Sequence, residues 1–231
     1  MQYECLIAGL EDLHLGQKPK LTEQQLLESL QEQLSPGDWC LIELLRRKAD
    51  DNLLREKFEQ DEVQDRFHET SLSEADFLTQ MLYEEGLRCK NKLLRRWFEF
   101  NLNLNNVLAA AVCQKHGYDP QKVIVGENEV AQLLRRGGVQ KNVNLAAALP
   151  ELKEIVSLTE ITDLLEREKH IDALRWQWLE DNALFNYFDI DAVLAYYLKA
   201  TILHRWDDLT KEKGEEVFRN LLADMKKDIK F

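Results

Sequence analysis

The sequence has little glycine, proline and β-branched aliphatic residue. Its 231 residues include 9 Gly and 4 Pro, about half the share of these two residues in an average globular protein. Leucine occurs 40 times, against 9 Ile and 11 Val, whereas strands favour β-branched side chains. These proportions argue against an all-β or parallel α/β fold. The 45% of hydrophobic residues is enough to build a core and excludes intrinsic disorder. We therefore expect an all-α fold, with imperfect helical hairpins or three-helix bundles joined in one elongated or funnel-like chain.

Positive charge is outnumbered by negative charge. Lys and Arg number 30 and Asp and Glu 42, which gives a formal net charge of −12. Proteins bind nucleic acid mainly through cations that displace counterions from phosphate. The charge therefore argues against nucleic acid as the main partner, although it leaves room for a local basic patch.

Long hydrophobic runs are missing. The purest apolar run, Val107–Cys113, has seven residues, whereas a helix that crosses a bilayer needs about 20. Acidic residues precede the first lysine, Lys18, which is the opposite charge order to a secretory signal. We expect a cytoplasmic protein; a peripheral component of a membrane complex has the same properties.

The chain lacks the signatures of common active sites. Its four cysteines, at positions 5, 40, 89 and 113, are too far apart in sequence for a Cys-x-x-Cys motif, so we interpret them as reduced thiols. It has neither a Gly-x-Ser-x-Gly motif nor a phosphate-binding loop ending in Gly-Lys-Ser/Thr. We expect no catalytic residue, no cofactor and no bound metal.

One motif suggests a metal site. Glu11 and His14 form a Glu-x-x-His, which places a carboxylate and an imidazole one turn apart on a helix. A di-iron bundle needs a second such motif and two more glutamates, and the nearest candidate is only Asp65 with His68. We therefore expect these histidines, and the scattered His116, His170 and His204, to lie at helix ends or on the surface.

Capping signals define the helices of the first third. Thr22 with Gln25 forms a capping box that predicts a helix over 23–34. The next helix is expected to begin with Ser35 as N-cap and Pro36 as its first residue. These two helices are expected to form an antiparallel hairpin. The preceding segment, Met1–Leu15, is compatible with a strand or a short buried helix.

The segment Glu59–Asp76 contains seven acids and one base. It is compatible with an exposed helix or a solvated loop, and we interpret it as a mobile connection. Ser71 with Glu74 forms a capping box that predicts the start of a helix ending near Gly86.

The longest helical pattern covers Arg88–His116, with Gly117 at its end. Apolar residues recur along it at spacings of three and four: Leu93, Trp97, Phe100, Leu104, Val107 and Ala111. The asparagine-rich stretch Asn101–Asn106 interrupts good helix propensity and suggests polar contacts across the interface.

The remaining elements are shorter or less regular. Val123–Val125 is strand-like and precedes a helix over 127–136, and a small helix lies near Ala146. Ser157 with Glu160 is expected to cap a long helix, and Asp189 to cap the next. A last helix is expected over 211–229. These elements suggest one all-helical chain with possible sub-bundles at 1–86, 87–150 and 151–231.

Two groups of residues are candidate contacts for a protein partner. Five bases occur in nine residues without an acid: Arg88, Lys90, Lys92, Arg95 and Arg96. Arg88, Lys92 and Arg95 are expected to share a helix face. This face either is solvated and balances the acidic stretch or docks an acidic partner.

The second group is aromatic. Trp176 and Trp178 lie some 200° apart on a helix, so both cannot face one interior at equal depth. Most of the neighbouring aromatic residues belong to the core, but one of these two tryptophans can anchor a partner protein. Arg205, beside Trp206, is a further candidate contact.

Several segments resemble a bacterial family of uncharacterised proteins linked with V-type ATPases. This family is thought to replace the C-type component of the rotor, called d in eukaryotic complexes. The segments are EKHIDALRWQWL at 168–179, FDIDAVLAYYLK at 188–199, Arg205-Trp206, LIAGL at 6–10 and VGENE at 125–129. The similarity touches most of the chain and is concentrated in its last third.

The resemblance implies a non-enzymatic rotor component at the inner face of the membrane, where it couples the central stalk to the membrane proteolipid ring. Its partners are then the stalk proteins and the ring. C-type rotor components usually contain three bundles over a longer chain, so 231 residues suggest a reduced version. The alternatives are a helical adaptor or scaffold unrelated to ATPases and, after it, a metal-dependent helical enzyme.

Overall fold

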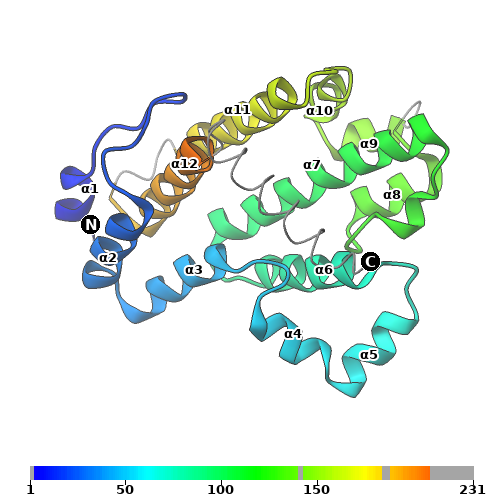
Figure 1. Cartoon of the computed structure of the whole chain (residues 1–231), viewed down its shortest axis with the longest axis horizontal. Helices are drawn as coiled ribbons and strands as arrows, with labels where there is room; N and C mark the ends of the chain where they lie inside the picture. Colours follow the sequence, from blue (N-terminus) through cyan, green and yellow to red (C-terminus); the bar gives the residue numbers. More distant parts are fainter. Residues whose placement is uncertain (1–2, 140–142, 184–187, 209–231) are drawn as a thin grey trace, which may run out of the picture. The chain divides into compact units, whose positions relative to one another are not determined.

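The protein is all-α in the residues that its computed structural model describes, which are 3–139, 143–183 and 188–208 (Figure 1). No strand occurs among them. The helices of the first half are α1 (Glu4–Gly9), α2 (Glu23–Gln33), α3 (Pro36–Arg46), α4 (Asn52–Phe58), α5 (Asp61–His68), α6 (Glu74–Leu87) and α7 (Lys92–His116). A 3-10 turn, η1 (Pro120–Lys122), is followed by α8 (Glu129–Gly137), α9 (Val143–Ala148), α10 (Leu152–Leu158), α11 (Leu164–Ala183) and α12 (Ile190–Asp208). The predicted fold class is confirmed.

The described residues form two compact units. Unit 1 combines the residues up to Trp39 with those from Arg175 onward, and unit 2 is Cys40–Leu174. The division falls inside α3 and α11. In unit 2, α7 packs against α6, α8 and α10, while α4 packs on α6. The sub-bundles expected from the sequence stay a prediction.

The first predicted caps are confirmed. Thr22 and Gln25 form the complete capping box of α2. The hydroxyl of Ser35 accepts a hydrogen bond from the Asp38 amide at 3.2 Å, which caps α3. For residues 1–15 the sequence is compatible with a strand or a short helix. The structure has a short helix there, α1, which covers Glu4–Gly9 and buries Leu6.

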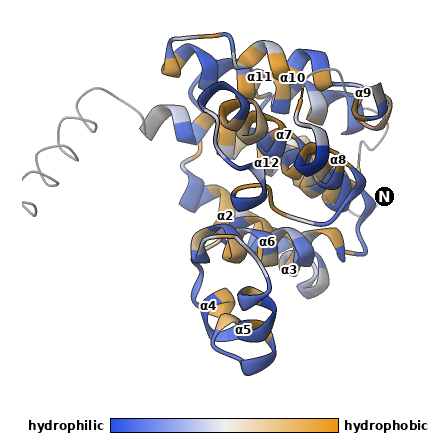
Figure 2. Cartoon of the chain, turned by 90° about the vertical axis from the view of Figure 1, so that its right-hand side faces the viewer, coloured by the Kyte–Doolittle hydropathy of each residue, from blue (hydrophilic) through white to orange (hydrophobic). Residues whose placement is uncertain are grey.

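The acidic segment 59–76 is not the predicted mobile connection, because α5 occupies its first half. Aromatic rings explain this order: the Phe67 ring lies 5.2 Å from that of Phe58 and 5.3 Å from that of Phe77, between centroids. The acids lie on the outer side, and Figure 2 shows α5 coloured mostly hydrophilic. Helix α6 begins after Ser73, whose hydroxyl accepts from the Asp76 amide, so the predicted capping box at Ser71 is wrong.

Helix α7 begins at Lys92, four residues later than predicted. The Asn91 side chain accepts a hydrogen bond from the Leu94 amide at 2.8 Å and so caps the helix. Gly117 ends the helix as predicted, with a left-handed φ of 71°. Along the apolar stripe every predicted residue is buried except Ala111, whose neighbour Ala110 is 2% exposed instead.

The pairing of α6 with α7 depends on a glycine. A Cβ atom added at Gly86 would overlap the Phe98 ring. The missing side chain therefore lets Phe98 rest directly on the α6 backbone.

Two predictions for the second half are wrong. Val123–Val125 forms no strand, because the described residues contain no strand with which it could pair; Val125 bonds instead to Asn106 of α7 and the Ile124 carbonyl to Arg135 of α8. Ser157 lies inside α10, and α11 is capped by Asp163, which accepts from the Glu166 amide at 2.8 Å.

At α12 the prediction holds, because Asp189 accepts hydrogen bonds from the Asp191 and Ala192 amides. The helix predicted over 211–229 lies outside the described residues.

Candidate docking surface

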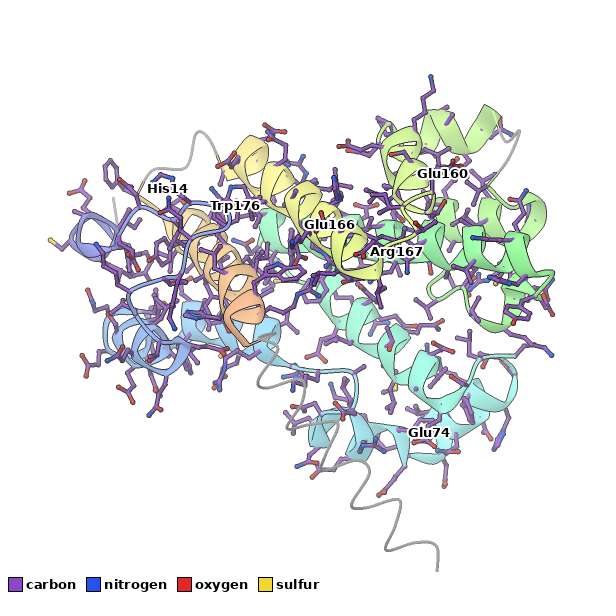
Figure 3. The ribbon with its side chains drawn as sticks, turned by 45° about the horizontal axis from the view of Figure 1, so that its top comes forward. His14, Glu74, Glu160, Glu166, Arg167 and Trp176 are labelled. Carbon is purple, nitrogen blue, oxygen red and sulfur yellow. The ribbon has the colours of Figure 1, made fainter. Side chains whose placement is uncertain are left out.

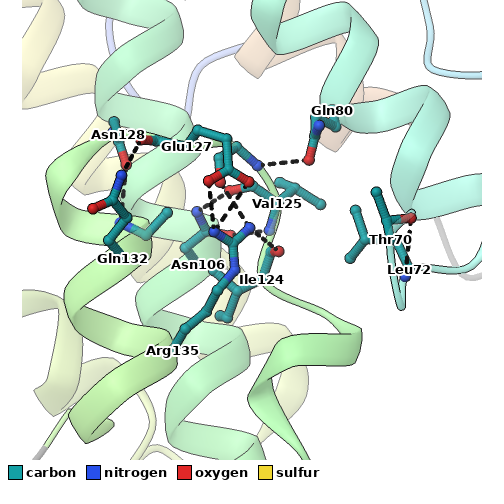
Figure 4. A network of polar contacts seen from close by, with 12 residues as sticks. Thr70, Leu72, Gln80, Asn106, Ile124, Val125, Glu127, Asn128, Gln132 and Arg135 are labelled. Carbon is teal, nitrogen blue, oxygen red and sulfur yellow. Dashed lines mark hydrogen bonds and ion pairs between the residues drawn. The ribbon is translucent and has the colours of Figure 1, made fainter. Parts of the chain in front are cut away.

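The loop that carries the VGENE segment is held by buried amide side chains. Asn106 on α7 donates to the Val125 carbonyl at 2.8 Å and accepts from the Val125 amide at 3.1 Å, as a neighbouring strand would (Figure 4). Gln80 on α6 accepts from the Gly126 amide at 3.1 Å. Gly126 has a φ of 79°, a conformation that favours glycine.

The same loop is bound from α8. The Arg135 guanidinium donates to the carbonyls of Ile124 and Gly126 at 2.9 and 2.7 Å and forms an ion pair with Glu127 at 3.2 Å. Asn128 caps α8 and donates to Asn103 on α7. The asparagine-rich stretch thus makes polar contacts between elements, as predicted, and this segment is a packing element of unit 2.

The five bases at positions 88–96 lie around the turn between α6 and α7, and we call them the basic corner: Arg88, Lys90, Lys92, Arg95 and Arg96. All five are exposed. Arg88 is the C-cap of α6, so the prediction that it shares one helix face with Lys92 and Arg95 is wrong. Two elements and their turn present the charges together.

The corner is poorly neutralised. Arg88 lies 3.7 Å from the Glu84 carboxylate, with its own side chain 79% exposed. The side chains of Lys90, Lys92 and Arg95 have no ion pair within the part of the chain that the structure describes. Acidic residues, which suit the positive end of a helix, are missing from the first turn of α7.

The adjacent acids Glu84 and Glu85 join helices of unit 2. Glu84 accepts from Arg66 of α5 at 2.8 Å. Glu85 pairs with Arg47 and, at 3.2 Å, with Lys57 of α4. Partial burial raises the pKa of the Glu85 carboxyl, but the hydrogen bonds and charges of Arg47 and Lys57 outweigh this and hold the pKa below its usual value.

The aromatic candidates differ in their exposure. Trp176 is 6% exposed, and its indole N–H donates to Glu180 at 3.0 Å. Lys199 of α12 lies over the Trp176 ring at 4.9 Å and pairs with the same carboxylate at 3.3 Å. Trp176, marked on α11 in Figure 3, therefore joins α11 to α12 inside unit 1, and we leave it out of the docking surface.

Trp178 is half-buried, so the two tryptophans lie at unequal depth, as helix geometry requires. Arg205 is exposed and lies over the Trp206 ring at 5.3 Å. Contacts of Trp178 and Arg205 with a partner stay predictions.

The Glu11–His14 motif is not helical, so the predicted placement one turn apart is wrong. His14 is exposed (Figure 3), while Glu11 accepts from the Lys20 amide at 2.6 Å. In residues 3–139, 143–183 and 188–208, no three His, Cys, Asp or Glu side chains are placed to hold a metal ion. The four cysteines are unpaired, and burial together with the Asp119 charge raises the pKa of Cys113.

Among the described residues, one buried histidine atom has no hydrogen-bond partner. The Nε2 of His204 on α12 is buried and makes no hydrogen bond. The other histidines outside the motifs are exposed, as expected: His116 at the end of α7 stacks on Tyr118, and His170 lies near the start of α11. None of the helices in the described residues combines the length and the apolar character needed to cross a bilayer.

Fold and surface together define a class: in the described residues this is an all-helical protein whose buried side-chain polar atoms are hydrogen-bonded, apart from the Nε2 of His204, and which carries an exposed basic corner. Within this class, the chain belongs to the family described as "Protein of unknown function (DUF2764)", whose model matches residues 1–74 and 57–229. No curated protein matches the chain, and no solved structure matches it.

Proposed function

We propose that the chain is a non-catalytic component of a rotary V-type ATPase, similar in role to the C-type rotor component. In this role it couples the central stalk to the membrane proteolipid ring, bound peripherally at the inner face of the membrane. The observation that carries the proposal is the sequence resemblance of residues 168–179 and 188–199, which fall in α11 and α12 with their flanking cap residues.

The internal contacts of both units support a mechanical role. In unit 1, Lys199 and Trp176 join α12 to α11 through the shared Glu180 carboxylate. In unit 2, the 25-residue helix α7 is continuous and the loop after it is bound on several sides. Transmission of torque needs such stiff elements and binding surfaces, and needs no reactive group.

Co-purification tests this function. The tagged full chain is recovered from membranes of its own organism after solubilisation in a mild detergent, with an untagged strain as control. We expect enrichment of both the proteolipid and the central stalk proteins, identified by mass spectrometry. Recovery of the chain without either of them overturns the proposal.

The same purification tests the alternative, a helical adaptor or scaffold unrelated to ATPases. An adaptor is recovered with other proteins, and its gene lies away from genes for ATPase components. The gene for a rotor component lies among those genes, which makes gene neighbourhood an inexpensive first measurement.

A further inference from the structure

We propose that the basic corner binds a short, carboxylate-rich segment of a protein partner. The inference deepens the proposed function by naming the chemistry of one partner, and it rests on that function only in treating the chain as a docking component. Arg88 approaches the segment from the end of α6, and Lys92 and Arg95 from the first turns of α7. Arginine suits this task because its guanidinium can pair with a carboxylate through two parallel hydrogen bonds.

The first argument is that folding does not explain these cations. The positive end of a helix favours acids and disfavours bases. Helices α2, α5, α6, α8 and α12 carry acids in their first turn. Helices α4 and α9 carry no acid there, whereas α7 carries no acid and begins with a cation, Lys92. Residues three and four apart on a helix are neighbours, so Lys92 also repels Arg95 and Arg96.

The second argument is that several arginines elsewhere in unit 2 bind within the fold. Arg47, Arg66 and Arg135 each pair with a glutamate. Lys90, Lys92 and Arg95 have no such partner among the described residues, although the chain has 42 acids to supply one. An incoming carboxylate would provide the neutralisation that the fold does not.

The surroundings of the corner favour a short protein segment over a membrane or a nucleic acid. Glu84 joins Arg88 to Arg66 on the acidic helix α5, and Glu99 is exposed one turn beyond Arg95. At physiological salt a charge is felt over about 8 Å. An extended polyanion would therefore meet these acids as well as the bases, while a segment with a few carboxylates stays within the corner.

A peptide titration on the full chain tests the inference. The probe is a short fluorescent peptide with several glutamates, and the same peptide with glutamines is its uncharged counterpart. The double variant Lys92→Glu/Arg95→Glu is compared with Lys122→Glu/Lys153→Glu, which makes the same change in net charge at exposed positions outside the corner. We expect the first variant to weaken binding by roughly tenfold or more, with a thermal midpoint no lower than that of the wild type, and the second to bind almost as the wild type does.

Three results overturn the inference: no binding of the glutamate peptide, equal loss in both double variants, or tighter binding to phosphatidylserine vesicles or duplex DNA than to the peptide. The assay contains no ATPase component. A negative peptide titration therefore does not affect the co-purification test of the proposed function. Conversely, specific binding of the peptide supports the inference about the basic corner even if no ATPase component is recovered.

Discussion

Two regions beside α7 differ in how their polar and charged groups are bound. The loop at 124–128 places its backbone polar groups against Asn106, Gln80 and Arg135, and every one of these contacts is a hydrogen bond within unit 2. The basic corner gathers like charges around the positive end of the same helix and leaves all five of them exposed. Folding accounts for the loop, whereas it does not account for the corner, for which we propose a binding role.

The largest expected effect is in the loop. Asn106→Ala removes both hydrogen bonds to Val125 in a buried site, and each unsatisfied backbone group costs about 1–3 kcal/mol. We expect unit 2 to lose about 2–4 kcal/mol of unfolding free energy, measured by urea denaturation. Asn105→Ala, at an exposed position that bonds only to the Tyr83 hydroxyl, is the matched control. A similar loss of unfolding free energy in both variants would mean that the buried loop contacts are no more stabilising than an exposed hydrogen bond.

A smaller loss is expected at the contact between α6 and α7. Gly86→Ala puts a methyl group into the Phe98 ring, and such overpacking costs about 1–3 kcal/mol, reduced by the better helix propensity of alanine. We expect a net destabilisation of about 1–2 kcal/mol in the same measurement. Gly37→Ala in α3 has no atom within 4 Å of the new Cβ and should be neutral or stabilising. Equal stability of Gly86→Ala and wild type contradicts the close packing.

Substitutions in the basic corner should raise the free energy of unfolding, in contrast to those in the loop and at Gly86. Replacing Lys92 and Arg95 by glutamate removes two cations from the positive end of α7, a change worth about 0.3–1 kcal/mol per residue at low salt. The free energy of unfolding of the double variant should therefore rise at low salt, and the gain should shrink as salt is added. A loss of stability would mean that the bases serve the fold, which would end the contrast with the loop.

The smallest effect concerns the ion pairs of Glu85 and appears only in acid. The folded pKa of Glu85 lies below its ordinary value of 4.5. The stabilisation is therefore complete above about pH 4.5 and is lost as the pH falls through the folded pKa. Below this value the wild type should lose stability more steeply than Glu85→Gln, whereas Glu99→Gln, at an exposed position, should follow the wild type. If the unfolding free energies of the wild type and Glu85→Gln change in parallel with pH, the ionisation of Glu85 does not contribute to stability.

Much of the fold follows from local signals. The caps at Thr22, Ser35 and Asp189 are satisfied by amides two or three residues further along the chain, so their geometry is written in the adjacent sequence. Where two caps compete, the pattern misleads: Ser71 and Ser73 are both followed by an acid three residues later, and the structure uses Ser73. Ser157 fails for the same reason, since a nearby Asp163 caps α11.

The candidate site is only partly predictable. The cluster of bases at 88–96 is visible in the sequence, and so is the local cap that separates Arg88 from α7, because Asn91 accepts from the amide of Leu94, three residues further along. The burial of Trp176 depends instead on tertiary packing, because the Lys199 that covers its ring comes from another helix.

The sequence by itself determined the helical class, the acidic charge, most of the apolar stripe of α7 and the caps of three helices, because each depends on composition or on residues within one or two turns. Only the tertiary structure decided that Asn106 replaces a strand for Val125, 19 residues away, and that Gln80 binds Gly126, 46 residues away. It also decided that Gly86 receives the Phe98 ring. Such contacts join residues distant in sequence, and the burial that makes them strong exists only once the helices are packed.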